Sequence, residues 1–102
     1  MQFPIACTLT AEELRDRRRT ILDAIRQEQV SAAVSPDGYS YAFEPTAETL
    51  QQLARLVELE RQCCPFLTFK IIVEAQGLPI RLEVTGPPEA KAVIAEFFGD
   101  AE

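Results

Sequence analysis

Two stretches of alternating residues near the C-terminal end constrain the fold of this chain most strongly. Apolar residues occupy every second position at Leu67, Phe69, Ile71 and Val73 and again at Ile80, Leu82 and Val84. Such a period is typical of strands with one apolar and one polar face, and the intervening Gln76-Gly77 favours a turn. The pattern predicts an antiparallel hairpin whose apolar face must be covered by a second layer.

The rest of the chain predicts helices that can form that layer. Apolar residues at helical spacing indicate helices at residues 11–27, 46–64 and 88–98. Thr10 and Glu13 form a capping box for the first helix, and Thr46 is the expected N-cap of the second. The first two helices therefore each begin at a residue able to bond their first free backbone N–H groups.

Two further strand regions complete the expected sheet. Residues 3–9 alternate as a short first strand, and residues 30–43 indicate a second hairpin that turns at Pro36-Asp37-Gly38. One face of this hairpin carries Tyr39, Tyr41 and Phe43. The predicted order is β-α-β-β-α-β-β-α, an α+β two-layer sandwich on a mainly antiparallel sheet. With 102 residues, we expect a single domain spanning residues 1–102.

The charge balance argues against several classes of partner. The chain has 10 basic and 16 acidic residues, a net charge of −6, whereas nucleic-acid binding needs clustered positive potential. No stretch reaches the roughly 18–20 continuous apolar residues of a membrane span. The start of the chain does not match a signal peptide, and three cysteines are an odd number. We therefore expect a cytoplasmic protein with reduced thiols and neither a nucleic-acid nor a membrane partner.

Glu60 fits its position in the second predicted helix poorly. Leu56 and Val57 belong to the apolar arc of that helix, and helical geometry places Glu60 within the same arc. Cys63 and Cys64 follow three and four residues later, so all three side chains can converge near the end of the helix. A carboxylate that faces a core must be paired, hydrogen-bonded, protonated or bound to a ligand.

The first predicted helix offers a partner for this carboxylate. Arg18 lies among the apolar residues Leu14 and Ile25 and is equally out of place there. We expect Arg18 and Glu60 to meet across the interface between the two helices. One interpretation is a purely structural ion pair that sets the helix register, with the cysteines as small core residues. The other is that the pair borders a functional site.

The three cysteines suggest what such a site would bind. On a helix, two adjacent cysteines cannot both point inward, so we expect Cys64 to face the core and Cys63 to lie nearer the rim. Cys7 faces inward by strand alternation and can bring a third thiol. Because the sequence has no histidine, a thiolate site favours soft ions such as Hg(II), Cd(II), Cu(I) and As(III). Zn(II) would need Glu60 or water as a fourth ligand.

The segment at residues 60–69, Glu-Arg-Gln-Cys-Cys-Pro-Phe-Leu-Thr-Phe, carries a family resemblance. It resembles small bacterial proteins of unknown function that share an E-R-x-C-C-P-F-L motif. The resemblance extends to residues 7–10, 13–14, 17–18 and 85–87, and so covers most of the chain. Similar segments look like C-terminal appendages of MerR-type, mercury-responsive regulators. The resemblance implies a link to heavy-metal handling, with Cys7, Glu60, Cys63 and Cys64 as the motif residues.

Three functions follow from these observations. The first is an accessory protein that binds a soft metal through Cys63 and Cys64, assisted by Cys7 and Glu60. In this function Arg18 supports the site by contacting Glu60 and does not bind the metal. The second is a structural or interaction module with buried cysteines, able to form a homodimer through the Tyr39/Tyr41/Phe43 strand or the Phe97-Phe98 end. The third is an enzyme with a cysteine nucleophile. The third is disfavoured because the cysteines lie near a helix C-terminus, where the helix dipole opposes a thiolate.

Overall fold

The computed structural model describes residues 12–99, which form three α-helices and a four-stranded antiparallel sheet. The elements in chain order are α1 (Glu12–Gln27), β1 (Gln29–Ser35), β2 (Gly38–Phe43), α2 (Ala47–Cys63), β3 (Thr68–Ile72), the short 3-10 helix η1 (Ala75–Gly77), β4 (Ile80–Thr85) and α3 (Ala90–Phe98). The strand order in the sheet is β1-β2-β4-β3. The α+β antiparallel fold is as predicted. The expected strand at residues 3–9 and the Thr10 capping box lie outside the described residues.

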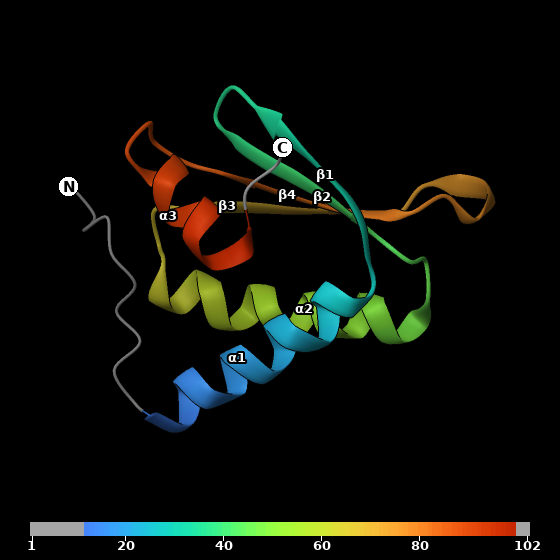
Figure 1. Ribbon diagram of the computed structural model, residues 1–102, viewed down its shortest axis with the longest axis horizontal. Coiled ribbons are helices and arrows are strands. Elements are labelled where there is room, and N and C mark those ends of the chain that lie inside the picture. Colours follow the sequence, from blue (N-terminus) through green and yellow to red (C-terminus); the bar gives the residue numbers. More distant parts are fainter. Residues whose placement is uncertain (1–11, 100–102) are drawn as a thin grey trace.

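All three helices lie on one side of the sheet (Figure 1). α3 packs on β2 and β4, α2 packs on β3, and α1 lies against α2. Along β2 and β4 every second residue is buried and, apart from the buried Gly38, the residues between them are half-buried. The sheet therefore presents its apolar face to the helices, which is the physical reason for the period-two pattern in the sequence.

The predicted aromatic face of β2 lies in the core of the chain. Tyr39, Tyr41 and Phe43 are all buried, and the Tyr41 hydroxyl donates a hydrogen bond of 2.7 Å to the carbonyl oxygen of Gly99. The ring of Tyr41 also packs against Phe98 of α3, with 6.1 Å between the ring centroids. Because these side chains fill the core, this face does not offer a surface to a second copy.

The helix ends follow the expected local chemistry. Thr46 is the N-cap of α2, and its side-chain oxygen accepts a hydrogen bond of 3.0 Å from the Thr49 backbone N–H. α3 begins at Ala90, two residues later than expected, because residues 88–89 form a turn. It ends at Gly99, whose φ of 106° is a conformation that favours glycine.

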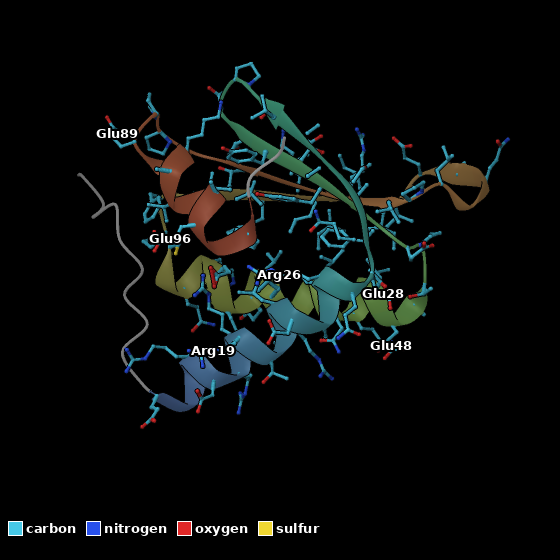
Figure 2. All side chains as sticks on the ribbon, in the orientation of Figure 1. Arg19, Arg26, Glu28, Glu48, Glu89 and Glu96 are labelled. Carbon is cyan, nitrogen blue, oxygen red and sulfur yellow. The ribbon has the colours of Figure 1, made fainter. Side chains whose placement is uncertain are left out.

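One predicted strand residue differs from expectation. β3 ends at Ile72, and Val73 is 59% exposed instead of facing the core. The chain leaves the sheet at Val73 ahead of η1, so alternation alone extended the strand one residue too far at this end. Figure 2 shows charged residues such as Glu48 and Glu89 at the periphery of the fold. Within residues 12–99, no helix is long and apolar enough to cross a lipid bilayer.

Candidate functional site

The last turn of α2 brings Glu60 and Cys64 together inside the protein. Cys64 is the C-cap of the helix, and its backbone N–H donates a hydrogen bond of 2.7 Å to the Glu60 carbonyl. This bond fixes the i,i+4 spacing that aligns the two side chains. The Cys64 Sγ lies 4.0 Å from Glu60 Oε1, and both residues are 0% exposed. A thiol and a carboxylate thus face each other away from bulk water.

Arg18 of α1 completes this cluster, and the predicted contact with Glu60 is present. The Arg18 Nε donates to Glu60 Oε2, and the Nη2 donates to Oε1 at 3.0 Å. The side chain of Arg18 is 12% exposed. A two-pronged pair of this kind matches the planar geometry of guanidinium to that of carboxylate. It supplies the partner that a buried carboxylate requires and joins α1 to α2.

The burial of this cluster shifts both titratable groups in the same direction. Burial raises the pKa of Glu60 above its ordinary value, although the Arg18 guanidinium opposes the shift. Burial, and then the Glu60 carboxylate, raises the pKa of the Cys64 thiol from 9.0 to about 11. Cys64 therefore holds its proton at neutral pH. This is the opposite of an activated cysteine nucleophile, whose pKa is lowered.

The other predicted site residues fall where side chains are not described. Cys63 is the last residue of α2, but its side chain is not among those that the structure describes. Cys7 lies before the described residues. Among the side chains that are described, no three Cys, Asp or Glu residues gather as a metal centre would require. The described structure thus brings together Arg18, Glu60 and Cys64, and metal ligation by Cys63, Cys64, Cys7 and Glu60 stays a prediction.

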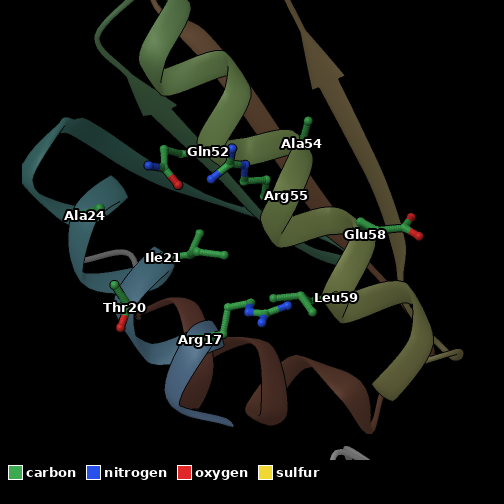
Figure 3. Close-up of a pocket in the computed structure, with 9 residues that line it drawn as sticks. All are labelled: Arg17, Thr20, Ile21, Ala24, Gln52, Ala54, Arg55, Glu58 and Leu59. Atoms are coloured by element: carbon green, nitrogen blue, oxygen red, sulfur yellow. The ribbon is translucent and has the colours of Figure 1, made fainter. Parts of the chain in front are cut away.

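An open groove between α1 and α2 was not predicted from the sequence. It has a volume of about 830 Å³ and is lined by Arg17, Thr20, Ile21, Ala24, Gln52, Ala54, Arg55, Glu58 and Leu59 (Figure 3). Helical spacing predicts that Arg55 and Glu58 lie on the solvent-facing side of the second helix. The available signal was the small residues Ala24 and Ala54, which leave space where larger side chains would fill the gap between two helices.

The raised thiol pKa predicts a stability change at alkaline pH. Because the folded-state pKa of Cys64 exceeds the unfolded value, its contribution is fully present below pH 9.0 and is lost as the pH rises through about 11. We expect about 2–3 kcal/mol of the free energy of unfolding to disappear across this range. Urea unfolding of the native chain and of Cys64→Ala, measured at a series of pH values, isolates this loss from other titrating groups. Parallel pH profiles for the two proteins would contradict the assignment.

Comparison of the chain with protein-family models, curated proteins and solved structures gives no match.

Proposed function

We propose that the protein binds a soft, thiophilic metal ion at the end of α2 and takes part in heavy-metal handling in the cytoplasm. Cys64 and the adjacent Cys63 are the proposed thiol ligands, and Cys7 is the third. The proposal depends on one observation above all: the Cys64 thiol and the Glu60 carboxylate lie 4.0 Å apart with no solvent exposure. Sulfur ligands favour soft cations, and the sequence has no histidine that could favour harder ones.

Glu60 has a supporting part in this proposal. Both of its carboxylate oxygens accept hydrogen bonds from Arg18, so direct ligation by Glu60 would require Arg18 to move. In its present position, Glu60 Oε1 faces the sulfur that must lose a proton before Cys64 can act as a thiolate. Hydrogen-bonded groups of this kind orient a metal ligand and tune its basicity.

The depth of Cys64 adds a condition to metal binding. Its side chain is fully buried and its pKa is about 11, so a metal must reach the sulfur and replace its proton. We infer that the last turn of α2 opens when the site is loaded. Binding would then release a proton and become tighter as the pH rises toward that pKa.

Titration of the reduced protein with Hg(II) tests the proposal. Thiolate-to-mercury absorption in the near ultraviolet is expected to saturate at one equivalent. Cys63→Ser/Cys64→Ser is expected to weaken binding by more than about 100-fold, and Glu60→Gln by about 10- to 100-fold. The Hg(II) affinity of Cys7→Ser shows whether the third thiol takes part in binding. Equal binding by the native chain and Cys63→Ser/Cys64→Ser would end the proposal.

A structural module is the second candidate, and one observation favours it. The Arg18–Glu60 pair joins α1 to α2 through two hydrogen bonds while Cys64 lies fully buried beside it. Such an arrangement is also what a register-setting pair with a small core cysteine would look like. In that case the cysteine variants would fold normally and the native chain would bind no metal at one equivalent. The same titration therefore distinguishes the two candidates.

A further inference from the structure

The groove between α1 and α2 has the dimensions of a ligand site. Its volume of about 830 Å³ falls in the range of pockets that accept small molecules, about 300–1,000 Å³. We propose that this groove binds a small organic carboxylate with an apolar body. The proposal does not depend on the buried Cys64, which is the cysteine whose side chain is described and which does not line the groove.

The apolar part of the ligand would lie on the floor between the helices. Ile21 and Ala24 of α1 and Ala54 and Leu59 of α2 line the gap, and Figure 3 shows Ile21 and Leu59 pointing into it. These four side chains are aliphatic and offer no hydrogen bond to a polar body. They suit an alkyl chain or a ring, whose burial supplies affinity without directional contacts.

The charged part of the ligand is selected by two arginines. Arg17 and Arg55 line the groove from opposite helices (Figure 3), and neither forms an ion pair with any acidic side chain that the structure describes. A chain with a net charge of −6 thus presents two guanidinium groups to one apolar gap. The guanidinium group of arginine is the side-chain group best matched to a carboxylate, because it can donate two parallel hydrogen bonds.

The acidic residue of the groove does not cancel this charge. Glu58 is held by Arg61, whose Nε and Nη2 lie 2.6 and 2.8 Å from its two carboxylate oxygens. The hydrogen bond from Arg61 lowers the pKa of Glu58, and Figure 3 shows its carboxylate turned away from the gap. Arg17 and Arg55 are therefore left to face an anion from outside.

Other occupants fit the groove less well. The N-terminal segment, residues 1–11, contains no acidic residue, so it cannot complement the two arginines. A nucleic acid is disfavoured by the net charge of −6. A small organic anion matches both the volume of the groove and the positive charge of its two arginines.

Isothermal titration calorimetry of the native chain with sodium octanoate tests this proposal, with octylammonium chloride as the probe of opposite charge. Octanoate is expected to bind at one site and at least about 10-fold more tightly than octylammonium. Arg17→Gln/Arg55→Gln is expected to weaken octanoate binding by about 10-fold or more. Arg19→Gln is the matched control, because this exposed arginine of α1 does not line the groove. It should leave the affinity unchanged.

A second variant tests the location without changing the charge. Ala24 is half-buried and lines the groove from α1, so Ala24→Trp should fill the gap and abolish octanoate binding while the helical circular dichroism stays native. The proposal is overturned if the native chain does not bind octanoate, or if the two probes bind equally. It is also overturned if Arg19→Gln weakens binding as much as the double arginine variant, or if Ala24→Trp binds normally.

Discussion

Replacing Arg18 with leucine is expected to lower the free energy of unfolding at pH 7 by about 3–5 kcal/mol, the usual result of removing one partner of a buried ion pair. The reason is that Glu60, which is 0% exposed, would lose the guanidinium that now donates to both of its oxygens. Its buried carboxylate must then either stay charged without a partner or take up a proton, and both cost free energy at pH 7. Urea denaturation monitored by circular dichroism measures the loss.

Two comparisons separate this effect from lost packing. In Arg18→Leu only the burial that raises the pKa of Glu60 would remain, so the deficit should shrink as the pH falls and Glu60 becomes protonated. Arg18→Leu/Glu60→Leu should recover most of the stability, because two apolar side chains can replace a buried pair at little cost. A single variant as stable as the native chain at pH 7 would refute the role of the pair.

Gly38→Ala is expected to destabilise the protein by about 3 kcal/mol, the upper end of the usual cost of overpacking a closely packed site. Gly38 begins β2 and lies opposite Thr85 of β4. A Cβ atom at this position would overlap the Val84 carbonyl oxygen and lie 3.0 Å from the Thr85 Cα. These are backbone atoms of the neighbouring strand, so the sheet itself would have to shift.

Gly77→Ala is the matched control for this substitution. Gly77 has a φ of 68°, but a Cβ there meets nothing within 4 Å. Its cost should be limited to the backbone conformation, about 1 kcal/mol. Thermal and urea unfolding of the two variants compare strand crowding with backbone preference, and equal losses would contradict the argument for Gly38.

The sequence by itself determined the elements and one long-range contact. Period-two alternation predicted the strands that carry Leu82 and Tyr41, both now in the core, because burial of one face is a local property of a strand. The contact between Arg18 and Glu60 was also predictable. Two opposite charges, each on the apolar side of its own helix, have few partners other than each other.

Only the tertiary structure decided the features that depend on distance between elements. The groove with Arg17 and Arg55 exists because α1 and α2 pack on each other while leaving a gap beside Ala24 and Ala54. The packing angle between two helices depends on both of them, so the sequence of one helix does not predict it. The sequence suggested a turn role for Gly38, whereas the crowding comes from β4. The high thiol pKa of Cys64 likewise results from complete burial beside Glu60, and burial is a property of the whole fold.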